Sequence, residues 1–191
     1  MALVICDMSI SLDGYVTGPN DSRENPFGDG AGSLHDWLFN DPTADDRAQL
    51  RQAADGTGAI VMGRKSFDKC VDMWGADGPL PGAPSFVVTH REPPASCPPS
   101  YTFVGDVAEA IRLAKAAGGD KAVGLHGATV MQQALPLGLV DEIVVHVIPL
   151  LIGGGTPLFA SLDSAISLER IDAVVTPAAT HLRFRVVNRP S

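Results

Sequence analysis

The sequence AIVMGRKSFDKCV, residues 59–71, contains the pattern that decides the fold. Residues 59–62 have the length and composition of a short buried β-strand, and residues 64–71 are predicted to form a helix. Gly63 stands between them, where a residue without a side chain lets the backbone turn and come close to a ligand. A strand that runs directly into a helix is the repeating unit of an α/β protein with a parallel sheet.

Strand and helix patterns continue to alternate on both sides of this unit. The other predicted elements are strands at 2–10, 85–89, 121–125 and 142–151, helices at 33–54, 107–117 and 128–135, and a final strand pair at 166–175 and 180–187 around Pro177. Because the last two strands have no helix between them, we expect them to form an antiparallel edge. The pattern therefore predicts one domain, residues 1–191, with a mostly parallel central sheet and helices on both faces.

Two of the predicted helices carry start signals. Asp106 precedes the helix at 107–117, and Glu109 stands three residues later, in the pattern of a capping box. Thr43 and Asp46 form a similar pair inside the segment 33–54. Before that segment, the chain is rich in Gly, Asn, Asp and Pro from residue 13 to residue 32, which predicts a long loop of the kind that is often functional.

Composition and charge exclude several classes of protein. The formal net charge is −8 and the pI is about 4.9, so the basic footprint that DNA and RNA binding requires is missing. The three cysteines show no C-x-x-C spacing and the five histidines show no metal-ligand spacing. This argues against a disulfide framework and a metal site, and it favours a reducing cytoplasm. The first residues are expected to be a strand instead of a signal peptide, and no apolar run approaches the roughly 18–20 residues that span a bilayer.

Two strand-to-helix turns have the composition of an anion site. At residues 63–66, Gly-Arg-Lys-Ser combines helix-terminal amides, two cations and a hydroxyl, which suits a phosphate or pyrophosphate; a glycine turn with surface cations is the alternative. Residues 124–129, Gly-Leu-His-Gly-Ala-Thr, form a second turn of small residues, without the full G-x-G-x-x-G motif or the P-loop lysine. The glycines at 153–155 form either a sharp structural turn or a substrate-lining loop.

Taken in order, four segments resemble one family. Residues 9–15, SISLDGY, resemble the M-S-L-D-G motif of riboflavin-biosynthesis reductases, and residues 61–67, VMGRKSF, resemble the V-M-G-R-x-T-[FW] motif of dihydrofolate reductases. Residues 124–135 occupy the place of the family's glycine-rich strand–helix turn, and residues 149–159, PLLIGGGTPLF, are similar to the late motif of the riboflavin-type branch. The chain thus resembles the dihydrofolate-reductase-like superfamily, and most of all the C-terminal reductase domain of the bifunctional riboflavin-biosynthesis deaminase-reductase.

This resemblance implies a dihydrofolate-reductase-like three-layer sandwich and NADPH as the cofactor. The implied cofactor-binding residues are Gly63, Arg64, Lys65, Ser66, Thr89, His90, Arg91, Gly127, Ala128 and Thr129. The implied substrate-binding residues are Trp37, Pro149, Leu151, Gly153 and Gly154. Asp13 and Asp36 are the candidate catalytic carboxylates. As alternatives, Asp13 would bond the amides of its own turn and Asp36 would stabilise a helix N-terminus.

The implied reaction is an NADPH-dependent hydride transfer to a C=N or related acceptor of a small-molecule substrate, most similar to that of 5-amino-6-(5-phosphoribosylamino)uracil reductase. The zinc-deaminase signature is missing, so a stand-alone reductase is expected. A dihydrofolate or pterin reductase and a non-catalytic nucleotide-binding module on the same fold are the alternatives. We also expect a homodimer formed through the apolar C-terminal strands, unless a segment of the same chain covers that edge.

Overall fold

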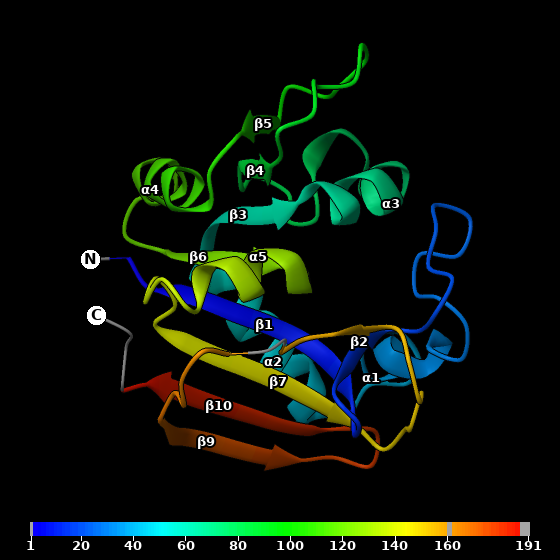
Figure 1. Ribbon diagram of the computed structural model, residues 1–191. Helices are drawn as coiled ribbons and strands as arrows, with labels where there is room; N and C mark the ends of the chain where they lie inside the picture. Colours follow the sequence, from blue (N-terminus) through cyan, green and yellow to red (C-terminus); the bar gives the residue numbers. More distant parts are fainter. Residues whose placement is uncertain (1, 160–161, 188–191) are drawn as a thin grey trace.

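The computed structural model describes residues 2–159 and 162–187. Its main strands are β1 (Val4–Ser11), β3 (Thr57–Gly63), β4 (Ser85–Val88), β5 (Tyr101–Val104), β6 (Ala122–His126), β7 (Glu142–Ile148), β9 (Leu168–Val175) and β10 (Thr180–Val186). They form one sheet in the order β5-β4-β3-β6-β1-β7-β10-β9 (Figure 1). Neighbouring strands from β5 to β7 are parallel, while β10 is antiparallel to both β7 and β9. The predicted parallel sheet with an antiparallel C-terminal edge is confirmed.

Helices cover both faces of this sheet, which gives the predicted three layers. Helices α4 (Val107–Gly118) and α5 (Ala128–Ala134) pack on one face, and α2 (Ala44–Gly56) and α3 (Arg64–Trp74) lie on the other. Figure 1 shows α5 in front of the central strands and α2 behind them. Strand β3 serves both layers, because Val61 packs in the core under α4 and α5 whereas Met62 faces Phe67 of α3.

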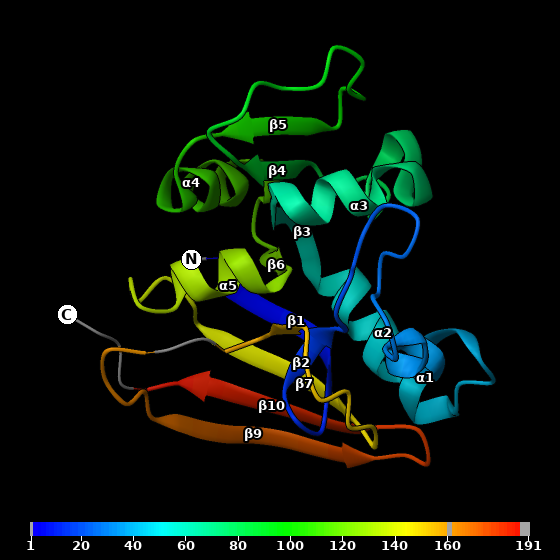
Figure 2. The ribbon, with the colours of Figure 1, turned by 45° about the vertical axis from the view of Figure 1, so that its right-hand side comes forward.

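The remaining elements are short. β2 (Tyr15–Thr17) and β8 (Thr156–Pro157) form a separate two-stranded sheet, and η1 (Gly32–His35), α1 (Asp36–Phe39) and η2 (Gly75–Asp77) are about one turn each. Figure 2 shows β9 and β10 along one side of the molecule and β5 at the opposite side. Within residues 2–159 and 162–187, no helix is long and apolar enough to cross a membrane.

The prediction of one continuous helix at 33–54 is wrong. The chain forms η1 and α1, breaks after Phe39 and starts α2 afresh at Ala44. Asp41 has a φ of +55°, which a right-handed helix does not contain, and Pro42 disfavours the helical conformation in the residue before it. The break leaves Thr43 as the cap of α2, with its hydroxyl accepting the Asp46 amide and its amide donating to the Asp46 carboxylate, so this predicted pair is confirmed.

Three other details differ from the sequence patterns. The strand predicted at 142–151 ends at Ile148, because Pro149 has no amide hydrogen with which to continue the ladder. Strands β2, β5 and β8 fall outside the predicted elements, since two to four residues are too few to establish an alternation. Asp106 caps α4 by accepting the Glu109 amide at 2.9 Å, as predicted, but the Glu109 carboxylate is bound by Arg112.

Candidate functional site

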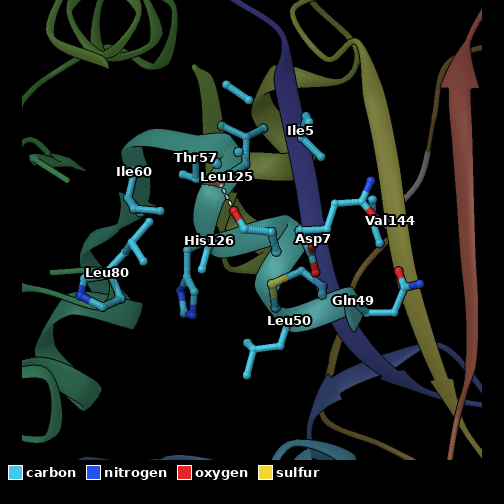
Figure 3. A pocket seen from close by; sticks show the side chains of 18 of the residues that line it. Ile5, Asp7, Gln49, Leu50, Thr57, Ile60, Leu80, Leu125, His126 and Val144 are labelled. Atoms are coloured by element: carbon cyan, nitrogen blue, oxygen red, sulfur yellow. Dashed lines mark hydrogen bonds between the residues drawn. The ribbon is translucent and has the colours of Figure 1, made fainter. Parts of the chain in front are cut away.

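A cavity of about 740 Å³ lies between the sheet and the layer that contains α2 and α3. One wall comes from β3, β6, β1 and β7, and the other comes from α2 and the segment at the end of α3 (Figure 3). Much of the lining is apolar, as at Ile5, Leu50 and Leu80, while Asp7 and His126 add polar groups to the same space. A cavity of this size with a few convergent polar groups is typical of a small-molecule site.

Two helix starts lie side by side at one end of the cavity. Because β3 and β6 are paired with Met62 opposite His126, the residues that follow, Gly63 and Gly127, are neighbours at the starts of α3 and α5. Gly127 has a φ of +94°, and a Cβ at this position would lie 2.3 Å from Ser66 Oγ. The position therefore requires glycine, which leaves the backbone open to close approach.

The predicted residues 63–66 and 127–129 lie side by side at these two helix starts, and we call them the cradle. A Cβ built on Gly63 would lie 3.5 Å from Thr129 Cβ. Helix α3 has 11 residues and no acidic residue in its first turn, so its N-terminal amides favour an anion. The Gly127 amide lies 3.5 Å from Met8 Sδ, and Met8 also lines the cavity. The cradle and the cavity therefore adjoin.

Two predicted arginines lie beside the cradle and share one carboxylate. Arg64 Nε contacts Asp68 Oδ1 at 2.7 Å, and Arg64 Nη1 donates to the Glu92 carbonyl at 2.9 Å. Arg91, which follows β4, contacts Asp68 Oδ2 at 2.7 Å. Because β3 and β4 are parallel neighbours, the two guanidinium groups come together at the carboxyl ends of these strands. Such a pair has the charge and geometry to bind a phosphate group.

The other predicted cofactor residues lie at the same edge. Lys65 is 55% exposed and pairs with Asp21 at 2.8 Å. Thr89 Oγ1 accepts the Arg91 amide at 3.0 Å, and His90 is exposed. The assignment of these residues to a cofactor stays a prediction.

The predicted substrate and catalytic residues are not brought together. Trp37 lines the cavity, whereas Asp13, Asp36, Pro149, Leu151, Gly153 and Gly154 lie outside its lining. Asp13 instead joins two loops, since it accepts from Ser11 Oγ at 2.5 Å and from the Gly153 amide at 2.7 Å. The Ser11 hydroxyl is the main cause that lowers the pKa of Asp13. Asp36 accepts from the Asn40 side chain at 2.6 Å. A catalytic role for Asp13 or Asp36 stays a prediction.

Four polar side chains, none of which the sequence patterns assigned to the functional site, form a hydrogen-bonded chain that begins at the cavity. Asp7 Oδ1 lies 2.8 Å from His146 Nε2, His146 Nδ1 lies 2.7 Å from His181 Nδ1, and His181 Nε2 lies 2.9 Å from Asp46 Oδ1. His146 is paired with Ser9 of β1 and with His181 of β10, so these side chains share one face of the sheet. Polar residues at alternate positions of an otherwise apolar strand were the signal in the sequence.

Trp37 covers this chain of side chains. Its Nε1 donates to Ser9 Oγ at 2.8 Å, and its ring centroid lies 4.2 Å from that of His146 and 4.9 Å from that of His181. Trp37 is 4% exposed, so it shields both imidazoles from water. The tryptophan is thereby fixed in position where it forms part of the cavity wall.

Two further histidines line the cavity. Burial lowers the pKa of both His35 and His126 to about 4, so both imidazoles are neutral near pH 7. Within the described part of the chain, neither Nδ1 atom has a hydrogen-bond partner. Both are therefore buried polar atoms that the described residues leave unpaired at the cavity wall.

Comparison with known proteins indicates one family. The family model of the RibD C-terminal domain matches residues 2–182. The uncharacterized protein YyaP of Bacillus subtilis (strain 168) is 28% identical over 188 residues, which cover 88% of this chain and 86% of that protein. Among solved structures, a putative riboflavin biosynthesis protein from Shewanella sp. PV-4 is similar with a TM-score of 0.74 at 25% identity, covering 98% of this chain and 100% of that one.

Two more distant structures share the fold. The deaminase/5-amino-6-(5-phosphoribosylamino)uracil reductase of Thermotoga maritima has a TM-score of 0.66 at 13% identity, covering 97% of this chain and 57% of that one. Enterococcus faecalis dihydrofolate reductase, complexed with NADP(H) and RAB-propyl, has a TM-score of 0.62 at 15% identity, covering 97% of both chains. The predicted dihydrofolate-reductase-like fold is confirmed. The chain belongs to the RibD C-terminal domain family.

Proposed function

We propose that this chain is an NADPH-dependent reductase that reduces a C=N or related bond of a small-molecule substrate. The observation that carries the proposal is the cradle, in which the starts of α3 and α5 come together beside a cavity of about 740 Å³. Membership of the RibD C-terminal domain family and a fold shared with an NADP(H)-bound dihydrofolate reductase support it. When bound, NADPH would supply the hydride.

The residues of the cradle fit such a cofactor. A Cβ on Gly127 would collide with Ser66 Oγ, so the glycine lets the Ser66 hydroxyl sit between the two helix starts, where it and the amides of α3 and α5 would bind the pyrophosphate. Arg64 and Arg91 would bind the 2′-phosphate and thereby favour NADPH over NADH, because NADH lacks that phosphate. The remaining proposed contacts come from Lys65, Thr89, His90, Ala128 and Thr129.

The cavity would hold the substrate. Its apolar walls suit a flat ring, while His35, His126 and Asp7 provide polar groups for the ring edge. We propose a substrate of the phosphoribosylamino-pyrimidine class, because the name of the Thermotoga maritima relative includes 5-amino-6-(5-phosphoribosylamino)uracil reductase. We also propose that residues 1–191 form one domain.

The proposal is tested by cofactor titration followed by a turnover screen. NADPH and NADH are titrated by fluorescence, and NADPH is expected to bind more tightly. NADPH oxidation is then followed with 5-amino-6-(5-phosphoribosylamino)uracil, dihydrofolate and a simple cyclic imine, of which we expect the first to react fastest. Equal affinity for the two nucleotides would contradict the proposed cofactor site. Tight NADPH binding without turnover of any probe would favour the non-catalytic binding module.

A further inference from the structure

The chain Asp7–His146–His181–Asp46 has one end in the cavity and the other inside the protein. Asp7 and His146 both line the cavity, but the Asp7 side chain is 32% exposed, whereas those of His146, His181 and Asp46 are 4%, 2% and 1% exposed. The inner end is closed by Thr43, whose hydroxyl and amide both donate to Asp46 Oδ2, at 2.7 and 2.8 Å. Asp7 is therefore the member of this hydrogen-bonded chain that solvent in the cavity reaches most readily.

The three contacts of the chain require three protons. Each contact joins two heavy atoms 2.7–2.9 Å apart and needs one hydrogen between them. Two neutral imidazoles carry one ring proton each and satisfy two contacts. The third contact needs an added proton, so the fully hydrogen-bonded chain contains two carboxylate charges and one added proton, a net charge of −1.

The inner groups do not hold this added proton tightly. Burial lowers the pKa of His181, and the hydrogen bond to Asp46 opposes that effect. Burial would raise the pKa of Asp46, but the hydrogen bonds from Thr43 and His181 outweigh it and lower the pKa to about 2. Asp46 is therefore the permanently charged end of the chain.

Among the described side chains that line this part of the cavity, Asp7 is the acidic one. His35 and His126 are neutral near pH 7 because burial lowers the pKa of both. Arg183 also lines the cavity, but its guanidinium is paired with Glu142 at 2.8 Å. The other carboxylate in the described lining, that of Asp120, precedes β6 and so lies at the opposite end of that strand from His126.

We propose that Asp7 donates the proton in the reduction and that His146, His181 and Asp46 store and resupply it. This inference rests on the proposed function. In the step, the acceptor carbon of the C=N bond gains a hydride, with its electron pair, from the reduced nicotinamide, and the π electrons move to nitrogen. Nitrogen takes the proton from the Asp7 carboxyl, whose carboxylate then accepts a hydrogen bond from His146 Nε2. Solvent returns one proton to Asp7 through the cavity.

A purely structural role, in which the chain ties the start of α2 to the sheet, makes different predictions. Replacing an aspartate of the hydrogen-bonded chain with asparagine would preserve such a tie. A purely structural tie would also not require the added proton. The matched control is Asp45→Asn, because Asp45 lies in the same first turn of α2 as Asp46 but is exposed. Thermal unfolding of every variant shows whether it is folded.

The first test needs no substrate. In the full chain with ¹⁵N-labelled histidine, the ring nitrogens of His146 and His181 are followed by NMR as the pH is changed. We expect them to shift together in one titration that Asp7→Asn moves and that Asp45→Asn leaves unchanged. Two imidazoles that each keep one fixed neutral tautomer, without a response to Asp7→Asn, would overturn the proposal.

The second test uses NADPH and 5-amino-6-(5-phosphoribosylamino)uracil. Asp7→Asn should lower kcat by about 100-fold or more, the range for loss of a general acid, while its NADPH affinity stays within about twofold of the parent. His181→Gln should lower kcat less and shift the pH profile of kcat. Parental kcat in Asp7→Asn would overturn the inference. Failure of the parent to bind NADPH would instead refute the proposed function, and the NMR titration would then decide whether the proton chain exists.

Discussion

Replacing Gly127 with alanine should separate cofactor binding from folding. Gly127 has φ +94° and ψ 149°, a conformation that costs a residue with a Cβ on the order of 1–3 kcal/mol. The new methyl group would also lie 2.3 Å from Ser66 Oγ, so the hydroxyl has to rotate away. The methyl group would then fill the space that we propose for the pyrophosphate.

Gly119→Ala is the matched control. Gly119 has φ +66° and ψ −131°, which also disfavours a side chain, but, its chain neighbours aside, no atom of the described residues lies within 4 Å of the position of its Cβ. It lies between α4 and β6, at the opposite end of that strand from Gly127. We expect both variants to lower the free energy of unfolding by about 1–3 kcal/mol. NADPH binding should be weakened in Gly127→Ala alone, by tenfold or more, which is about 1.4 kcal/mol.

Urea unfolding and fluorescence titration with NADPH measure the two effects on the same samples. Adding Ser66→Ala to Gly127→Ala should not restore binding, because the methyl group itself occupies the space. If Gly127→Ala and Gly119→Ala bind NADPH equally well and lose equal stability, the assignment of this turn to the cofactor is refuted.

Three further predictions concern charge, assembly and pH. Arg64→Ala should weaken NADPH binding by about 1–3 kcal/mol, measured by titration with the exposed Arg112→Ala as control, and an unchanged affinity would contradict the phosphate site. Strand β9 is a sheet edge with partly exposed apolar side chains, so sedimentation should show a homodimer that Ile171→Lys dissociates; a monomeric parent at micromolar concentration would exclude it. Burial lowers the pKa of His126 from 6.5 to about 4, so its neutral form contributes stability that is full above pH 6.5 and is lost as the pH falls through about 4. In His126→Phe, the free energy of unfolding measured with urea should depend less on pH between 6.5 and about 4. An unchanged pH dependence would contradict this prediction.

Local patterns were sufficient for elements that bury a whole strand or one helix face. Residues 59–62 and 107–117 show such patterns, and β3 and α4 lie there. The same reasoning failed at 33–54, where helical composition on either side hid the interruption that the conformation of Asp41 and the ring of Pro42 cause. Strand β5 was missed because it is defined by its pairing with β4 and not by its own four residues.

The candidate site shows the same division between local and distant information. The turn at Gly63 is predictable because the order strand, glycine, helix already places amides at the start of a helix. The contact between His146 and His181 depends on the register of β7 with β10, and a shift of one residue would move one imidazole to the opposite face. Asp46 joins them only because the interruption after Phe39 sets the start of α2. Sequence alone therefore supplies these polar residues without their contacts.

Stability by itself does not account for two adjoining buried imidazoles. Thr43 and Asp46 already cap α2 without them, and apolar residues of similar volume at positions 146 and 181 would pack against Trp37 without needing an added proton. Replacing buried charged networks with apolar side chains is often neutral or stabilising, whereas a partly satisfied polar network is costly. The hydrogen-bonded chain of side chains also reaches, at Asp7, the cavity where a ligand would lie. A hydrogen-bonded chain that needs one added proton and reaches the cavity at Asp7 has the geometry of a proton relay, which favours the proposed role of Asp7 over a purely structural one.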